Sequence, residues 1–423
     1  MGFNGVRKIR TKPRGEVMAA LDVGSTKVVC FIARIEDNGR PRVIGIGHQV
    51  SRGVRAGAII DMDAAEKAIG HAVSSAEQMA GEQIRDVIVN ISGGNPASQM
   101  MGVEVSIAGH DVGEDDLRRA LRAQGPNRIP PDSEILHAIP VSYAIDGARG
   151  IRDPRGMFGD RLGVDIHLVT AGSGPLRNLA TCISRCHLET DGYVVSPYAA
   201  GLACLVEDEM ELGCTVIDMG GGATSIAVFM EGNLVFADCV PVGGAHVTND
   251  IARGLTTPVV HAERMKTLYG SAIPSVSDER EIIDVPQVGE EEPAQANHVP
   301  RSLLTGIIQP RMEEMFELVR SRLEASGFEK VAGRRVVLTG GGSQLQGVRE
   351  LAQLILDKQV RMGRPLAIHG LAESTCGPAF STATGLLAYA VRNQGDLALA
   401  GVGADEPPEG LWSKLGGWFR DNL

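Results

Sequence analysis

Short apolar runs that end in glycine-rich turns are the clearest pattern along the chain. From Val17 to Ile35, one apolar run leads into the turn Asp22-Val23-Gly24-Ser25-Thr26-Lys27 and a second run follows it. The layout recurs where Thr215 to Ile217 lead into Asp218-Met219-Gly220-Gly221-Gly222-Ala223-Thr224, with Ile226 to Phe229 afterwards. Each copy predicts a strand, a turn and a strand. Two copies predict a duplicated domain that faces itself across a cleft.

A third glycine cluster follows another apolar run. Arg335 to Leu338 reads as a buried strand that runs into Thr339-Gly340-Gly341-Gly342-Ser343, and Val348 to Leu356 has a helical pattern. This order predicts that the glycines lie at the N-terminus of a helix.

Residues 410–423 have the spacing of an amphipathic helix. Five apolar side chains fall within one arc of about 100° on a helical wheel: Leu411, Trp412, Leu415, Trp418 and Phe419. The two tryptophans are the only ones in the chain, and Trp favours the headgroup boundary of a membrane. The small, acidic, Pro-containing stretch at 397–409 predicts a linker. We therefore expect a membrane-binding helix; the alternative is a terminal helix docked on the protein's own core.

Composition limits the other partners. The net charge of -11 argues against broad attraction to nucleic acid. Residues 1–16 carry a basic cluster without the hydrophobic core of a signal peptide, so secretion is not expected. The cluster predicts a flexible tail; the alternative is a weak helper for membrane binding. Seven cysteines without zinc or thioredoxin spacing predict a reduced cytosolic protein. No apolar stretch reaches about 18 residues, so the sequence predicts a protein that lies on a membrane without crossing it.

The glycine-rich turns suit phosphate binding, because backbone N–H groups approach phosphate oxygens where no Cβ stands in the way. Asp22 and Asp218 are placed to converge on a hydrated Mg²⁺ from opposite sides, since this cation retains waters. Lys27 adds a positive charge near the phosphates. The turns also supply three hydroxyl donors, Ser25, Thr26 and Thr224. The alternative is two unrelated β-turns.

The three clusters together resemble the phosphate-1, phosphate-2 and adenosine motifs of the actin, Hsp70 and sugar-kinase superfamily. Pro197 to Gly201 and Ser381 to Gly385 stand where that fold has two helices crossing between its lobes, and their small residues permit close packing at a hinge. The resemblance implies an α/β, actin-like (ribonuclease H-like), two-lobed duplicated fold that binds ATP and Mg²⁺.

Two further segments resemble the FtsA family within that superfamily. Gly243 to Ala252, followed by Ala262-Glu263-Arg264-Met265-Lys266, looks like the family's entry into subdomain 2B. Leu136 to Pro140 and Asp153 to Gly156 resemble its subdomain 1C, which replaces a subdomain of actin. By this resemblance Glu263 and Lys266 contact ribose and adenine; the alternative is an exposed ion pair on a helix. The resemblance as a whole assigns to the nucleotide Asp22, Gly24, Ser25, Thr26, Lys27, Asp218, Gly220, Gly221, Gly222, Thr224, Gly243, Gly244, Glu263, Lys266, Gly340, Gly341, Gly342 and Ser343.

The resemblance also implies partners and a location. It implies a protein that polymerises, binds the C-terminal peptide of FtsZ on subdomain 2B, and contacts later division proteins through subdomain 1C. The expected place is the cytoplasmic face of the inner membrane, bound to lipid, at the division septum. Arg301 and Arg311 match a basic patch for the acidic FtsZ peptide, unless they are only exposed helix arginines. Gly192 stands near the place of actin's glutamine, so we expect weak or absent ATPase activity.

The resulting division of the chain has ten parts. A basic N-terminus spans 1–16 and subdomain 1A spans 17–93, 166–210 and 373–396, interrupted by subdomain 1C at 94–165. Subdomain 2A spans 211–250 and 333–372, interrupted by subdomain 2B at 251–332. The linker at 397–409 and the amphipathic helix at 410–423 follow.

Three other functions have the same nucleotide loops. A small-molecule kinase or phosphotransferase, or a PilM-like pilus scaffold, should lack the membrane-seeking tail. An Hsp70-type chaperone needs a large substrate domain after the ATPase, for which the chain has no room.

Overall fold

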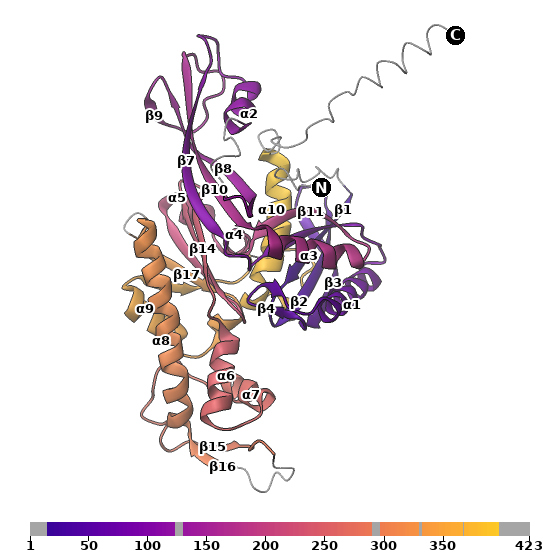
Figure 1. Ribbon diagram of the computed structural model, residues 1–423, viewed down its shortest axis with the longest axis vertical. Helices are drawn as coiled ribbons and strands as arrows, with labels where there is room; N and C mark the ends of the chain where they lie inside the picture. The colour runs from indigo at the N-terminus through magenta and orange to yellow at the C-terminus, as the bar shows by residue number, and fades with distance from the viewer. Residues whose placement is uncertain (1–14, 123–129, 290–296, 330–331, 367, 397–423) are drawn as a thin grey trace, which may run out of the picture.

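Two five-stranded sheets of the same topology form the centre of the protein. The computed structural model describes residues 15–122, 130–289, 297–329, 332–366 and 368–396. The first sheet has the order β11-β6-β1-β2-β3 and the second the order β14-β13-β12-β17-β18. In each, the first strand pairs antiparallel with the next and parallel with a later one. The predicted duplication is confirmed by this repeated pattern. In Figure 1, β1, β2 and β3 of the first sheet lie on the right, and β14 and β17 of the second lie on the left.

The strands of both sheets are short and mostly buried, as the apolar runs predict. The first sheet comprises β1 (Val17–Val23), β2 (Lys27–Ile35), β3 (Pro41–Val50), β6 (Asp86–Ile91) and β11 (Glu189–Val195). The second comprises β12 (Cys214–Met219), β13 (Thr224–Met230), β14 (Asn233–Val240), β17 (Arg335–Thr339) and β18 (Gln359–Met362). Two-residue strands β4 (Val54–Arg55) and β5 (Ala58–Ile59) form a small hairpin between β3 and α1.

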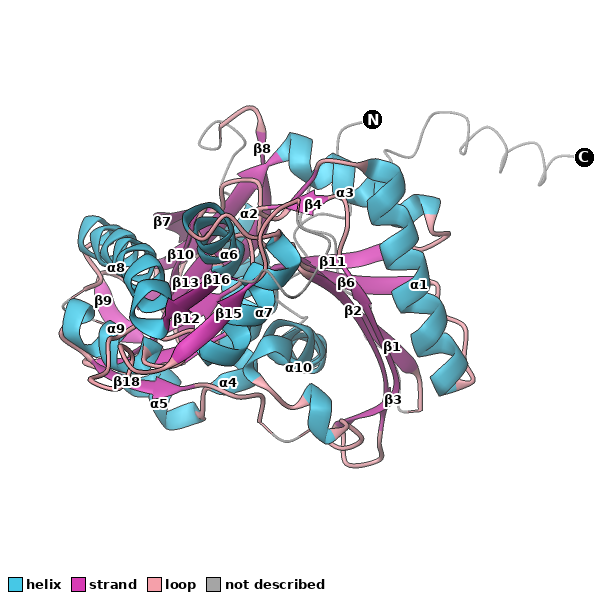
Figure 2. Cartoon of the chain, turned by 90° about the horizontal axis from the view of Figure 1, so that it is seen from below, coloured by secondary structure: helices cyan, strands magenta, loops and turns pink. Residues whose placement is uncertain are grey.

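Helices cover these sheets (Figure 2). Helix α1 (Met62–Ala80) packs on β2 and β3, begins at the side-chain cap Asp61 and ends at Gly81 in the left-handed region. Helix α9 (Val348–Leu356) packs beside β18. Helix α3 (Ser173–Arg185) packs beside α1 and β11, and α5 (Glu207–Leu212) packs beside β13. In the part of the chain that the structure describes, no helix combines the length and apolar character of a membrane span.

A four-stranded sheet with its own hydrophobic core is inserted in the first lobe, as a resemblance to subdomain 1C leads one to expect. This inserted subdomain comprises β7 (Ala97–Ser106), α2 (Glu114–Arg122), β8 (Ser133–Ile145), β9 (Ala148–Ile151) and β10 (Arg161–Gly172). Its contact with the second lobe is specific. The Ser98 hydroxyl donates to the Ala237 carbonyl and accepts from the Ala237 N–H, each at 2.7 Å, and lies 2.9 Å from Nε2 of His167.

A second excursion extends from the other lobe. It comprises α6 (Gly244–Gly254), α7 (Val259–Tyr269), β15 (Ile282–Val285), β16 (Asn297–Pro300) and α8 (Arg301–Ser326). Figure 1 places this group at the end of the molecule opposite the inserted subdomain.

Helices α4 (Ser196–Cys204) and α10 (Ser381–Asp396) contact each other between the lobes. A Cβ built on Gly385 would lie 1.7 Å from the Ala199 carbonyl oxygen, so only glycine permits this approach. The predicted close packing of the connecting helices is therefore confirmed.

The third glycine cluster differs from its prediction. Gly341–Gln344 forms a short 3-10 helix, and α9 begins only after Gly347, whose φ is 77°. Leu345 has extended backbone angles and separates the two helices. The glycines thus begin a single tight turn of their own, because Gly340, at φ 83°, starts it directly from the strand.

Candidate nucleotide site

The two Asp-headed turns have the same backbone geometry. The Gly24 N–H donates to the Lys27 carbonyl at 3.0 Å, and the Gly220 N–H donates to the Ala223 carbonyl at 2.9 Å. In both turns a Cβ on the first glycine would lie 3.0 Å or less from the accepting oxygen. The glycines are therefore required by the turn itself, and the shared geometry extends the duplication to the candidate site.

The two turns meet across the cleft. A Cβ on Gly222 would lie 2.5 Å from Oγ of Ser25, and one on Gly221 would overlap the Thr26 side chain. Together with Gly340 and Gly341 of the third cluster, they enclose a cavity of about 160 Å³. Its lining consists of Asp22, Gly24, Ser25, Thr26, Lys27, Gly57, Asn90, Ser92, Ser196, Asp218, Gly220, Gly221, Gly222, Ala223, Ser225, Gly340, Gly341, Pro378, Ala379 and Thr382.

The two aspartates stand at corresponding strand ends and are buried. Burial raises the pKa of Asp22 to about 7; the charge of Lys27 opposes this rise and the charge of Asp218 adds to it. Burial raises the pKa of Asp218 to about 6, against the hydrogen bond from Thr382 and the charge of Lys27. Two carboxylates held in a water-poor site gain from a cation between them. Perturbed pairs of this kind are typical of binding sites.

Lys27 links the first turn to the start of α10. Its Nζ donates to the Ala379 carbonyl and lies 3.8 Å from the centre of the Phe380 ring. Burial lowers the pKa of Lys27, while Asp22 and Asp218 raise it. The cavity lining thus places the Lys27 ammonium group near two carboxylates and the glycine-rich turns.

These residues fit a magnesium nucleotide. Cβ atoms on Gly221 and Gly222 would overlap Thr26 and Ser25 of the first turn, so only glycine lets the two turns approach as closely as a phosphate held between them requires. The carboxylates supply the hard oxygen ligands of a hydrated divalent cation. Within the described chain, the cavity lining contains no glutamine, glutamate or histidine that would act as a general base.

Seven of the assigned nucleotide residues lie outside this cavity lining, most of them bonded within the protein. The Thr224 hydroxyl is fully buried and donates to the Val242 carbonyl at 2.8 Å, so it is not directed at a phosphate. The Ser343 hydroxyl donates to the Gly340 carbonyl at 2.8 Å and tightens the 3-10 turn. The others are Gly243, Gly244, Gly342, Glu263 and Lys266.

Gly243 and Gly244 contact the second turn but do not line the cavity. The N–H of Gly244 donates to the Gly220 carbonyl at 3.0 Å, and that of Ala245 donates to the Gly221 carbonyl at 2.8 Å. The first N–H groups of α6 are therefore used to hold the turn. A Cβ on Gly243 would lie 2.6 Å from the Gly220 carbonyl oxygen, which explains this glycine.

Glu263 and Lys266 form a polar cluster beside that support. Lys266 Nζ lies 2.7 Å from Oε2 of Glu263, 2.9 Å from the Thr248 hydroxyl and 3.2 Å from the Gly244 carbonyl. The i, i+3 ion pair of the alternative interpretation is therefore present, and Lys266 also lies next to the residues that support the second turn. A role of the pair in binding ribose and adenine stays a prediction.

Sequence patterns missed several residues that the fold brings to the cavity. Asn90, in β6, accepts a hydrogen bond from the Val23 N–H at 2.7 Å and donates to the Ser196 hydroxyl at 3.1 Å, which holds the first turn against α4. Thr382 donates to Oδ2 of Asp218 at 3.0 Å. Asn90 had one available signal, since it is a polar residue within the apolar strand Asp86–Ile91.

Arg301 and Arg311 are both paired inside the protein. Arg301 lies 3.0 Å from Glu281 and 3.4 Å from the buried Asp278, and its side chain is 13% exposed. Arg311 forms a bidentate pair with Asp250 at 2.5 and 3.2 Å. The alternative of an exposed helix arginine is therefore wrong for Arg301, because its guanidinium bonds to the Tyr269 carbonyl of α7, to Glu281 and Asp278 before β15, and to Gln346. Peptide binding by either residue stays a prediction.

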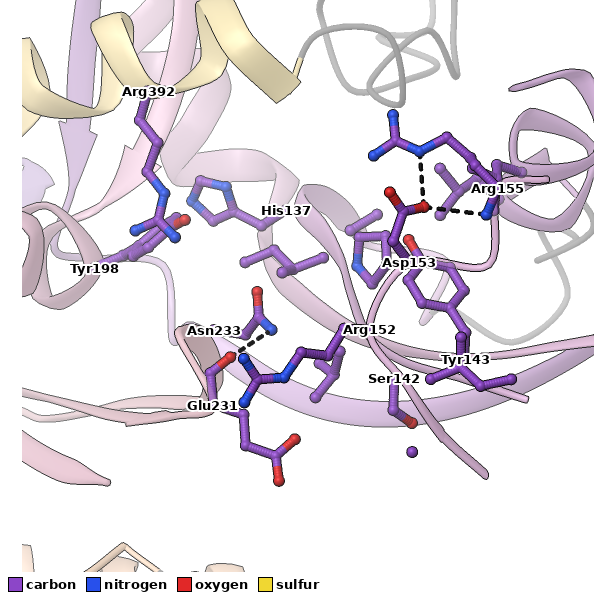
Figure 3. Close-up of a pocket in the computed structure, with 18 of the residues that line it drawn as sticks. His137, Ser142, Tyr143, Arg152, Asp153, Arg155, Tyr198, Glu231, Asn233 and Arg392 are labelled. Carbon is purple, nitrogen blue, oxygen red and sulfur yellow. Dashed lines mark hydrogen bonds and ion pairs between the residues drawn. The ribbon is translucent and has the colours of Figure 1, made fainter. Parts of the chain in front are cut away.

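A second and larger cavity, of about 570 Å³, lies between the inserted subdomain and the connecting helices (Figure 3). His137 is fully buried there, accepts from the Val195 N–H at 3.1 Å, and has its pKa lowered to about 3 by burial. In the view, Tyr198 from α4 and Arg392 from α10 lie on the left, Tyr143 and Arg155 of the inserted subdomain lie on the right, and Arg152 lies between them.

Solved structures of similar fold define the class of protein. The PilM–PilN type IV pilus biogenesis complex contains a chain with a TM-score of 0.62 and 18% identity, over 90% of this chain and 99% of that one. MreB5 of Spiroplasma citri bound to ADP has a TM-score of 0.51 and 14% identity, over 88% and 95%. The chain has a two-lobed, actin-like α/β fold, and the predicted fold class is confirmed.

Sequence relatives then give the family. A family model described as "Cell division protein FtsA" matches residues 215–385, and one described as "SHS2 domain inserted in FTSA" matches residues 93–170. Cell division protein FtsA of Rhizobium meliloti is 48% identical over 98% of this chain and 95% of its own length. That of Escherichia coli K12 is 32% identical over 96% of each. The chain belongs to the FtsA family of cell division proteins.

Family membership settles the coarse function. The chain has a role in cell division, at the division site. The alternatives of a small-molecule kinase and a pilus scaffold do not have this role. The predicted membrane-binding residues, Leu411, Trp412, Leu415, Trp418 and Phe419, lie outside the residues that the structure describes, as does the linker at 397–409.

Proposed function

We propose that this protein is an ATP-binding, actin-like adaptor that polymerises and tethers the FtsZ ring to the cytoplasmic face of the inner membrane. One observation carries the nucleotide part of the proposal: two Asp-headed glycine turns of equal geometry enclose one cavity with a lysine and the third glycine cluster. ATP with Mg²⁺ is the ligand that this set of donors and carboxylates fits best.

We propose that ATP governs conformation and polymerisation, with slow or absent hydrolysis. In this proposal the two carboxylates hold the cation, and the described lining then offers Lys27 as its other ionisable side chain. The connecting helices are in contact through Gly385 and Ala199, so lobe closure around a nucleotide changes the shape of the whole molecule. A turnover in the range of ordinary kinases, about 1 to 100 per second, would contradict this part.

The membrane part of the proposal rests on the sequence of residues 410–423. Its apolar arc with two tryptophans favours an interfacial helix, and a polymer would hold the membrane through many such helices. Liposome co-sedimentation with ATP tests it: the intact protein should pellet with lipid, and a version that ends at Glu409 should not. Equal behaviour of the two would remove this segment as the anchor.

We also propose that the FtsZ peptide binds the excursion formed by residues 251–332, where Arg311 is the more accessible of the two predicted contacts. Arg311→Gln should weaken binding of a labelled FtsZ C-terminal peptide several-fold, because a charge-assisted contact is lost. Arg320 lies on the same helix, and among the residues that the structure describes its ion pairs are with Glu317 and Glu324 of that helix, so Arg320→Gln is the matched control. Equal affinities of both variants and the unmodified protein would exclude Arg311 from the peptide site.

Recruitment of later division proteins through the inserted subdomain completes the proposal. The larger cavity supports it, since it lies where this subdomain meets both connecting helices. Cross-linking from a photoreactive residue placed at Ser142 tests whether such proteins bind there.

A further inference from the structure

Two adjacent hydroxyl residues begin helix α10 at the edge of the nucleotide cavity. Oγ of Ser381 lies 2.6 Å from Oγ1 of Thr339 at the end of β17, and the Cys204 thiol lies 3.2 Å from the same oxygen. The Thr382 hydroxyl donates elsewhere, to Oδ2 of Asp218 at 3.0 Å. The first turn of α10 is therefore bonded to the second lobe.

The rest of α10 belongs to the first lobe. It packs against β1, β2 and β6 of the first sheet and lies against α4 at Gly385. The Thr382–Asp218 hydrogen bond thus joins a helix seated on one lobe to the carboxylate of the other. Asp22, the corresponding carboxylate of the first lobe, is at the end of β1, the strand that α10 covers.

We propose that Thr382 is a positioning residue that fixes the Asp218 carboxylate for a hydrated divalent cation bound with the nucleotide. This inference rests on the proposed nucleotide function. Strand pairing with Ser225 and Thr339 fixes the backbone of Asp218 but leaves its side-chain torsions free. The Thr382 hydroxyl holds one carboxylate oxygen, so those torsions are fixed as well.

Gly340 of the third cluster lets the other carboxylate oxygen lie against the backbone. A Cβ on Gly340 would lie 2.3 Å from Oδ1 of Asp218, so this position of the carboxylate requires glycine at residue 340. Asp218, Gly340 and Thr382 all line the cavity. The hydroxyl and the glycine together fix the carboxylate at the cavity wall, where a water of the cation would reach it.

Three variants of the full-length protein test the role of the hydroxyl. Thr382→Val has nearly the same shape and removes the hydroxyl, whereas Thr382→Ser keeps it. Ser381→Ala is the matched control, because it removes the neighbouring hydroxyl, which contacts Thr339 and not Asp218. Binding of a fluorescent ATP analogue is titrated with Mg²⁺, and its affinity is measured separately in EDTA.

We expect Thr382→Val to raise the Mg²⁺ concentration for half-maximal binding about tenfold, as the loss of a hydrogen bond to a charged group implies. Thr382→Ser and Ser381→Ala should leave it within about twofold of the unmodified protein, and the affinity in EDTA should not change in Thr382→Val. Should the valine variant not fold, Thr382→Ala gives the same comparison.

Two results would overturn the inference. An unchanged Mg²⁺ requirement in Thr382→Val excludes a positioning role, and an equal loss of affinity with Mg²⁺ and in EDTA assigns the hydroxyl to general structure. Neither result touches the proposed function, which fails separately if the unmodified protein binds no ATP analogue in either condition.

Discussion

The contact between α4 and α10 predicts that replacing glycine by alanine at residue 385 destabilises the protein, although the same replacement at an open position of a helix stabilises it. Gly385→Ala adds a Cβ that would lie 1.7 Å from the Ala199 carbonyl oxygen and 2.3 Å from its carbonyl carbon. Both atoms belong to backbone, so α4 and α10 must move apart. Such overpacking costs about 1–3 kcal/mol, and the better helix propensity of alanine offsets about 0.5–1 kcal/mol of it. We expect a net loss of up to about 2.5 kcal/mol in the free energy of unfolding.

Gly306 in α8 provides the control. It is also inside a helix, but a Cβ there meets no atom within 4 Å. Gly306→Ala should therefore stabilise the protein by about 0.5–1 kcal/mol through helix propensity alone. Urea unfolding followed by circular dichroism should show the midpoint falling for Gly385→Ala and rising for Gly306→Ala. If both variants shifted the midpoint upwards, the close approach of the two connecting helices would be refuted.

Two other features give further predictions. Because the pKa values of Asp22 and Asp218 are raised to about 7 and about 6, a cation must displace protons; affinity for Mg·ATP should fall roughly tenfold from pH 8 to pH 6, measured by calorimetry, with a much smaller fall in EDTA. Ser98→Ala leaves the Ala237 backbone groups unpaired and should cost about 1–3 kcal/mol of stability and speed proteolysis of the inserted subdomain. Ser106→Ala, at the exposed end of the same strand, should change neither the stability nor the rate of proteolysis. For the pH prediction, a Mg·ATP affinity that does not change with pH would exclude the raised pKa values.

The parts of the site that the sequence predicted are those made by local geometry. An Asp at a strand end followed by spaced glycines determines its own turn, so both turns and the lysine were found from the pattern. The duplication was found for the same reason, because each copy carries a complete strand, turn and strand.

Residues that act through distant partners could not be predicted in this way. Thr382 and Asp218 are far apart in the chain, and no local pattern indicates which hydroxyl reaches the carboxylate. Thr224 was assigned to phosphate because it follows the glycines, but the alternation of β13 turns it towards Val242. The pairing of Arg301 with Asp278 likewise depends on how α8 packs on the segment before β15.

The pair of hydrogen bonds between Ser98 and the Ala237 backbone has a consequence for how the edge of the second sheet meets other chains. Strand β14 ends the second sheet, and an uncovered terminal strand offers its N–H and C=O groups to any chain that can pair with it. The inserted subdomain lies against this strand through β7 and β8, and one serine side chain occupies both groups of Ala237. Sideways strand-to-strand aggregation is thereby blocked at this border of the second sheet.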